Sequence, residues 1–269
     1  MYRQILIPVQ EASEVEPLVR FAAMLLDADG EIRVLHVIQT RSLPQVTREW
    51  RESVRLAIPA HEAGAALDVR VDPSIRASTD VSGEILDSQE SHGIDAILMT
   101  LRGNKRSRNP FVGHTASAIL QHARCDVLII NRLAMVADAL PRILLPTFAE
   151  NPPPQAMRVA EEIALHNSGA PIVTFSIAAR GDEESESRER SERSPRGVPM
   201  THKYSFISHA LLGRRSQLPE LIVRHATREG YGLLLVGEET VQPEGPLLTR
   251  RFIEQLFRAA PGPVMALRS

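Results

Sequence analysis

Apolar residues in the first half of the chain form short continuous runs that alternate with longer stretches of helical spacing. The runs are rich in Ile, Leu and Val, and 66–71 adds a strict apolar alternation, so both patterns predict strands. Strands are expected at 4–9, 32–38, 66–71, 94–99 and 126–130, with helices at 13–30, 46–63, 78–93 and 113–123. Near-continuous apolar strands separated by helices predict an α/β fold with a parallel sheet covered on both faces.

Small polar residues and glycines mark the expected helix ends. Ser13, followed three residues later by Glu16, has the spacing of a capping box, and Gly30 would end that helix. Ser78 or Thr79 would cap the later helix at 78–93, and Gly93 would end it.

The two ends of the chain resemble two stretches near its middle. RQILIPVQ opens the chain and PRILLPTF follows at 141–148, while ILQHARCDVLII at 119–130 resembles LFRAAPGPVMAL at 256–267. The offset from Pro8 to Pro146 differs by one position from the offset between Val127 and Val264. A nearly constant offset predicts two copies of one domain, at 1–132 and 141–269.

The second copy repeats the order of elements with one interruption. Strands are expected near 142–146, 171–177, 203–211, 231–236 and 263–267, and helices near 153–166, 216–229 and 248–259. Residues 180–199 are almost wholly charged, Ser, Gly and Pro, so they bury too little apolar area to offset chain entropy. We expect a mobile insertion there, and the alternative is a solvated helix with oppositely charged pairs.

Composition narrows the function classes. The chain has 269 residues, 43% of them hydrophobic, and a formal net charge of −2, so any attraction for an anion must be local. One cysteine, Cys125, permits no intrachain disulfide and no thiolate metal cluster, which fits a reducing cytoplasm. The first residues have no signal-peptide layout, and no apolar run reaches the roughly 20 residues that span a bilayer.

Other catalytic or binding patterns are weak. The nine histidines show no spacing typical of metal ligands, and neither a nucleophile elbow nor a catalytic triad is visible. Cys125 is expected to be a small buried residue rather than a nucleophile. The basic run at 102–108 lacks interleaved aromatic residues, so we expect no nucleic-acid partner.

The stretch RGNKRSRNPFVG at 102–113 is the strongest candidate for chemistry. It follows a buried strand and precedes a helix that begins near Gly113, whose free N–H groups favour an anion. Gly103 permits close backbone approach to a phosphate, and four cations, among them Arg106, add positive field. His114 and Thr115 lie in the first helical turn, where they can donate hydrogen bonds. The alternative is an ordinary solvated basic loop.

The order ILIPV, VLHVI, ILMTLRGNKRSRNPFVG, helix and CDVLII resembles the universal stress protein family, twice over, as in a tandem member. The resemblance implies two five-stranded sheets that pair as an internal pseudo-dimer through their last strands, 126–130 and 263–267. It also implies, in some members, ATP or another adenine nucleotide held by a loop of pattern G-x2-G-x9-G-[S/T]. Here that loop reads Thr100-x2-Gly103-x9-Gly113-His114, with Met99 before it.

The chain departs from the ATP-binding pattern of the family at several positions. Gln10 stands where those members carry the Asp of P-x-D. Val37, in contrast, matches the residue that those members carry on the adenine side. In the second copy Phe148 takes that place, and the loop reads Gly237-x2-Thr240-x9-Arg250-Arg251 with Glu238, Glu239 and Glu244 added. Because negative side chains repel phosphate, we expect no nucleotide in the second copy.

These residues give a main interpretation and two alternatives. The main one is a non-enzymatic stress-response or signalling module with a nucleotide site in 1–132, formed by Gln10, Val37, Met99, Thr100, Gly103, Arg106, Gly113, His114 and Thr115. A regulatory cytoplasmic domain or partner of a membrane transporter is the first alternative, and a nucleotide hydrolase is the second. The two domains are expected to pair with each other, and the expected outside partner is a second copy of the chain or a membrane transporter.

Overall fold

The computed structural model describes residues 1–39, 54–101, 113–131, 142–147, 153–166, 170–179, 209–213, 218–237, 250–260 and 264–268. The chain divides into two compact units, and each is described by itself. The first contains Met1–Leu101 and Val112–Ile129, and the second contains Ile130–Ser269.

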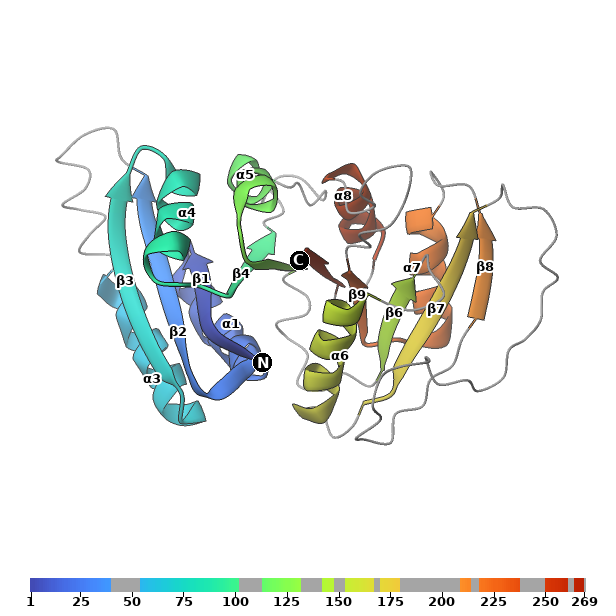
Figure 1. Cartoon of the computed structure of the whole chain (residues 1–269), viewed down its shortest axis with the longest axis horizontal. Coiled ribbons are helices and arrows are strands. Elements are labelled where there is room, and N and C mark those ends of the chain that lie inside the picture. Colours follow the sequence, from blue (N-terminus) through green and yellow to red (C-terminus); the bar gives the residue numbers. More distant parts are fainter. Residues whose placement is uncertain are drawn as a thin grey trace. The chain divides into compact units, whose positions relative to one another are not determined.

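The first unit alternates strands and helices from its first residues onward (Figure 1). Its buried positions are mainly Ile, Leu and Val of the strands and the inward faces of the helices, as in a sheet covered on both sides. The elements are β1 Tyr2–Val9, η1 Ala12–Glu14, α1 Val15–Ala23, β2 Leu26–Gln39, η2 Val54–Leu56, α3 Ala57–Leu67, β3 Arg70–Ser78, α4 Val81–Ser91, β4 Ala96–Leu101, α5 His114–His122 and β5 Asp126–Asn131.

The described elements of the second unit follow the same succession, except that residues 180–208, between β7 and β8, lie outside the described part of the chain. Its strands β6 and β9 are buried at every position, which explains their largely apolar sequence. The elements are β6 Ile143–Thr147, α6 Pro154–His166, β7 Ile172–Ala179, β8 His209–Gly213, α7 Leu218–Glu229, β9 Leu233–Gly237, α8 Arg250–Ala259 and β10 Val264–Arg268.

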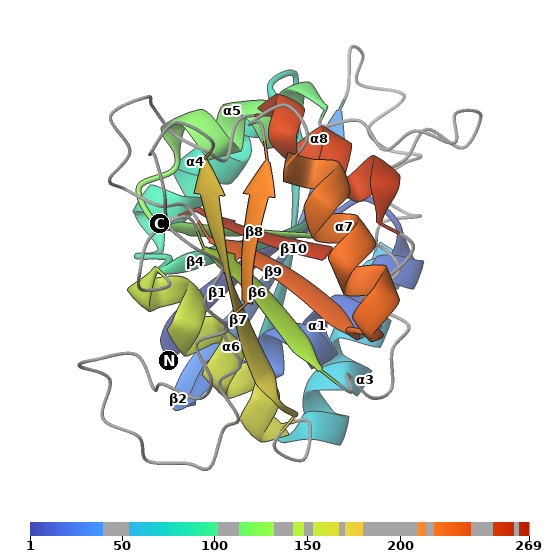
Figure 2. The same ribbon diagram turned by 90° about the vertical axis from the view of Figure 1, so that its right-hand side faces the viewer.

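Strand order is the same in both units. The first sheet has the order β3-β2-β1-β4-β5 and the second β8-β7-β6-β9-β10, with parallel pairing between β1 and both its neighbours and between β6 and both its neighbours. In the first unit α1 and α3 lie on one face of the sheet and α4 and α5 on the other (Figures 1 and 2). The predicted α/β class with two repeated five-stranded sheets is therefore confirmed.

The first helix is shorter than its apolar spacing predicts. The expected helix at 13–30 ends at Ala23, and β2 begins at Leu26. The apolar residues Leu25 and Leu26 fit either pattern, and pairing with β1 decides between them, because the Tyr2 N–H donates to the Leu25 carbonyl at 3.0 Å. Gly30 ends no helix: it lies within β2, where a Cβ would come 2.6 Å from Leu26 Cγ.

The next helix and strand are shifted toward the C-terminus. The strand expected at 66–71 is observed as β3 from Arg70, because α3 continues to Leu67. Asp68 ends α3 in the left-handed conformation, with φ of 56°, which Asp adopts more readily than most residues. Of the helix expected at 46–63, residues 46–53 lie outside the described part of the chain.

The predicted N-caps were wrong, whereas one predicted helix end is confirmed. Asp80, not Ser78 or Thr79, caps α4, since its carboxylate accepts the Gly83 N–H at 2.9 Å. The first turn after β1 uses Glu11 and Glu14 as its capping box instead of Ser13 and Glu16. Gly93 follows α4 with φ of +60°, the left-handed conformation that glycine adopts without strain.

Two predictions about the second copy are untested. The insertion expected at 180–199 lies outside the described residues, as does 203–208 of the expected strand. Pairing of the two units through 126–130 and 263–267 also stays a prediction, because each unit is described by itself.

Candidate functional site

The carboxyl ends of β1 and β4 form the topological switch point of the first sheet. From β1 the chain passes to β2 and β3 on one side, and it then crosses to β4 on the other side of β1. Ligands of open parallel sheets bind where the strand order reverses in this way. Gln10 follows β1 directly and Thr100 lies near the end of β4, so the fold brings these two predicted residues to the same strand ends.

A carboxylate from the start of α1 joins these strand ends. Glu14 is 2% exposed, and its Oε2 accepts the backbone N–H groups of Gln10 at 3.0 Å and Glu11 at 3.2 Å. The hydroxyl of Thr100 donates to Oε1 of the same carboxylate at 3.3 Å. Glu14 therefore connects two segments that are 86 positions apart in the sequence.

The end of β2 adds a histidine beside these residues. His36 lies opposite Val9 in the parallel pairing, and its Nδ1 is 2.9 Å from the Val9 carbonyl oxygen, to which it donates. Val37, the predicted residue on the adenine side, follows His36 and is partly buried, while Met99 is buried. Gln10, Val37, Met99 and Thr100 thus lie at the ends of three adjacent strands.

Helix α5 begins at the other side of the predicted loop. Gly113 is its N-cap with φ of −64° and ψ of 170°, an ordinary extended conformation, so the backbone does not require glycine there. A Cβ at this position would meet no atom of the described residues within 4 Å. His114 is exposed and Thr115 partly buried in the first turn, and among the described residues no side chain caps the start of the helix.

Part of the predicted site lies outside the described residues. Gly103 and Arg106, with the other cations of 102–108, belong to this part. In the second unit the same holds for Phe148 and for 238–249. The described Gly237 is packed against α6, since a Cβ built on it would lie 2.5 Å from Ala156 Cβ and 3.2 Å from Pro153 Cγ.

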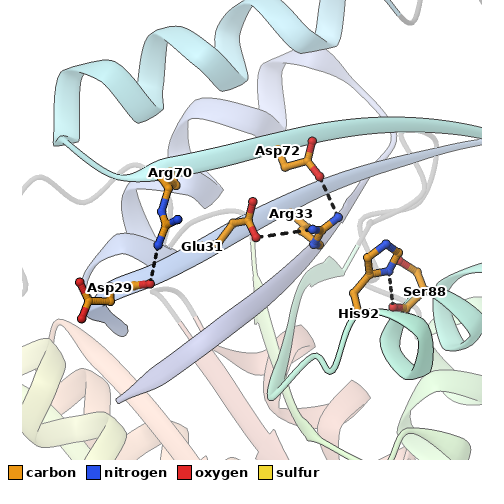
Figure 3. Close-up of polar contacts among 7 residues, drawn as sticks. All are labelled: Asp29, Glu31, Arg33, Arg70, Asp72, Ser88 and His92. Carbon is orange, nitrogen blue, oxygen red and sulfur yellow. Dashed lines mark hydrogen bonds and ion pairs between the residues drawn. The ribbon is translucent and has the colours of Figure 1, made fainter.

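Charged groups on β2 and β3 are paired with each other (Figure 3). Arg33 donates to Asp72 on the neighbouring strand at 2.7 Å and lies 3.5 Å from a Glu31 carboxylate oxygen. Arg70 donates to the Asp29 carbonyl at 2.9 Å. These contacts join the charged side chains of two neighbouring strands, which indicates that they stabilise the sheet.

Potential metal ligands and nucleophiles do not gather in the described residues. Within the ranges that the structure describes, no three His, Cys, Asp or Glu side chains are grouped to hold a metal ion. His92 instead donates from Nδ1 to the Ser88 carbonyl at 3.0 Å at the end of α4 (Figure 3). Burial, with the nearby charges of Asp126 and Asp95, raises the pKa of the partly buried Cys125 thiol to about 12, so the nucleophilic thiolate is scarce at neutral pH.

Sequence reasoning missed Glu14 and His36. A signal for Glu14 was present, because Glu11 and Glu14 have the same spacing as the capping box that was assigned to Ser13 and Glu16. Its bond to Thr100 had no signal in the sequence, since it depends on the pairing of β1 with β4. His36 lay within a predicted strand and carried no motif.

Comparison with known proteins places the first unit in a family. Residues 1–131 match the model of the universal stress protein family. The first half of the chain is a universal stress protein domain. The second unit repeats its strand order, so the chain has the tandem arrangement that the repeat predicts. Comparison with curated proteins gives no match for the chain.

Solved structures support the fold over nearly the whole chain. A universal stress protein from Archaeoglobus fulgidus DSM 4304 has a TM-score of 0.70 at 18% identity, with 98% of this chain and 97% of that chain covered. A putative universal stress protein from Pseudomonas aeruginosa UCBPP-PA14 has a TM-score of 0.59 at 14% identity, covering 99% and 93%.

A third solved structure belongs to another functional class. The cytoplasmic domain of a prokaryotic cation chloride cotransporter has a TM-score of 0.60 at 10% identity, covering 99% of this chain and 95% of that chain. At such identities these likenesses show the fold alone. Among the described residues, no helix is long and apolar enough to cross a membrane.

Proposed function

We propose that this tandem universal stress protein is a non-enzymatic stress-response or signalling module that binds an adenine nucleotide, of the ATP or AMP type, through its first unit. The observation that carries the proposal is the position of Gln10 and Thr100 at the switch point between β1 and β4. The start of α5 at Gly113 supports it, since free N–H groups of a helix N-terminus attract phosphate. The four cations of 102–108 would add to this attraction.

The second unit is proposed to lack a nucleotide. At the position aligned with Thr100 it carries Gly237, whose backbone is packed tightly against Ala156 and Pro153 at the start of α6. The second and third glycine positions of the loop pattern are Thr240 and Arg250, and three glutamates are added. A negative field and the missing glycines both disfavour a phosphate there.

A thermal-shift panel tests the proposal directly. The unmodified protein is heated with ATP, ADP, AMP, cyclic nucleotides and inorganic phosphate, because a ligand that binds the folded state raises stability by RT ln(1 + [L]/Kd). We expect at least one adenine nucleotide to raise the melting temperature at millimolar concentration. No shift with any of them would overturn nucleotide binding.

The start of α5 is tested by calorimetry on Gly113→Val. A β-branched side chain would project beside the helix N-terminus, where no described atom lies within 4 Å, and weaken ATP binding, while the ordinary backbone conformation tolerates it. The matched control is Gly230→Ala in the second unit, a glycine at which a Cβ meets no described atom within 4 Å. The control loses some stability because Gly230 has φ of +69°, yet it should bind ATP as before.

A regulatory partner of a membrane transporter is a second candidate function. The likeness that favours it is the cytoplasmic domain of the cation chloride cotransporter, matched along 99% of this chain. Cross-linking in native membranes, followed by identification of the linked peptides, tests it. A transporter linked to the first or second unit would support this function, and cross-links confined to soluble proteins would contradict it.

The absence of catalysis is also a proposal, against the alternative of a nucleotide hydrolase. It is supported by the lack of grouped metal ligands in the described ranges and by the protonated state of Cys125. Release of inorganic phosphate from ATP, measured with the unmodified protein and with Gly113→Val, decides the matter. Phosphate release that is lost in the variant would establish a hydrolase.

A further inference from the structure

Glu14 places a buried negative charge at the strand ends where the nucleotide is proposed to bind. Glu14 is 2% exposed, and both oxygens of its carboxylate accept hydrogen bonds. A buried carboxylate is stabilised when several donors point at it, as the Gln10 N–H, the Glu11 N–H and the Thr100 hydroxyl do here.

These hydrogen bonds change what the strand ends can recognise. The N–H groups of Gln10 and Glu11 would otherwise attract an anion, but they already donate to Glu14. The Thr100 hydroxyl donates its hydrogen bond to the same carboxylate, so its oxygen has only lone pairs left for a ligand. The ends of β1 and β4 therefore offer acceptors and negative charge, and they match a neutral group that donates hydrogen bonds.

We infer that Glu14 is a specificity-determining residue, which selects the hydroxyl-bearing nucleoside part of a ligand at the ends of β1 and β4 and keeps phosphate away from them. The inference rests on the proposed nucleotide site in the first unit. Glu14 thus supplies, from the first helical turn, the negative charge that Gln10 does not provide. Phosphates are left to the start of α5 at Gly113.

A structural role alone would make Glu14 a helix cap and nothing more. The variant Glu14→Gln separates the two roles, because the amide oxygen can still accept the two backbone N–H groups while the charge is removed. The matched control is Glu16→Gln, which removes the same charge two positions later from a side chain that is 61% exposed.

The experiment measures the affinities of ATP and adenosine by calorimetry for the unmodified protein and both variants. We expect the ratio of ATP affinity to adenosine affinity to rise about tenfold in Glu14→Gln, since the variant removes a negative charge that repels the phosphates of ATP and not the neutral adenosine. Glu16→Gln should leave this ratio unchanged. Thr100→Val, which removes the hydroxyl acceptor and keeps the charge, is a second variant and should weaken both compounds by about threefold while leaving the ratio unchanged.

The outcomes separate this inference from the proposed function. Binding of both compounds with the same ratio in Glu14→Gln overturns the inference and leaves the nucleotide site standing. Tight ATP binding without any adenosine binding by the unmodified protein also overturns it. ATP binding by Glu14→Gln alone supports the inference but contradicts nucleotide binding by the unmodified protein, and no binding by any variant overturns both.

Discussion

The backbone of Gly237 lies so close to Ala156 that a Cβ built on the glycine would be 2.5 Å from the alanine Cβ. The start of α6 thus covers the end of β9 by direct packing. At the aligned position of the first unit, Thr100 is contacted by Glu14 from the start of α1. The same strand end is therefore covered by the first helix in both units, through apolar packing in one and hydrogen bonds in the other.

Replacing Gly237 by Ala should destabilise the second unit. A Cβ contact of 2.5 Å forces α6 or β9 to shift, and overpacking of this kind costs about 1–3 kcal/mol of unfolding free energy. Urea unfolding measures the loss. Gly113→Ala is the control and should change stability far less, because its Cβ meets no described atom within 4 Å. Equal losses in both variants would contradict the packing argument.

Asp80 should contribute to acid stability through the cap of α4. The Gly83 N–H and the Ser82 hydroxyl donate to its carboxylate and lower its pKa below the ordinary 3.8. Because the pKa is lowered by folding, the stabilisation is present above pH 3.8 and is lost as the pH falls through the folded value.

The variant Asp80→Asn tests this dependence, since Asn also caps helices but does not titrate. The stability difference between the unmodified protein and Asp80→Asn, followed in urea from pH 7 downward, should shrink below pH 3.8. Asp87→Asn, an exposed acid of the same helix, is the control. A difference that stays constant down to the acid transition would refute the prediction.

Cys125 should react slowly with alkylating reagents in the folded protein. Folding raises its pKa from 9.0 to about 12, and this lowers the thiolate fraction at pH 8 by roughly a thousandfold. Mass spectrometry after timed exposure to iodoacetamide measures the rate, with the urea-unfolded chain as reference. Similar rates in the folded and unfolded states would show that the thiol is neither buried nor perturbed.

The two units should associate when the chain is cut between them. The pairing through 126–130 and 263–267 follows from the repeat and from the resemblance to the family, and it would cover two apolar last strands. The two halves, separated near residue 137 and mixed, are expected to form a complex or to self-associate in analytical ultracentrifugation. Two stable monomers would exclude this pairing.

The sequence alone determined most of the architecture. Stretches such as 4–9, 94–99 and 126–130 are short apolar runs separated by helices. Such runs are typical of parallel strands that are buried on both faces. The repeat was visible because each copy must bury the same core in the same order. The resemblance to the family singled out Gln10 and Thr100 as candidate site residues, and Gly113 was singled out as the glycine that opens the predicted helix at 113–123.

Tertiary structure decided the points at which two local patterns compete. Leu25 and Leu26 fit a helix by their spacing, yet Leu25 accepts a hydrogen bond from Tyr2 of β1, and Leu26 pairs with Tyr2 and begins a strand. Glu14 is one of three acids within six residues, and only the parallel pairing of β1 with β4 brings Thr100 to its carboxylate. Periodicity reports which face of an element is buried, but the partner of a polar side chain depends on segments far away in the sequence.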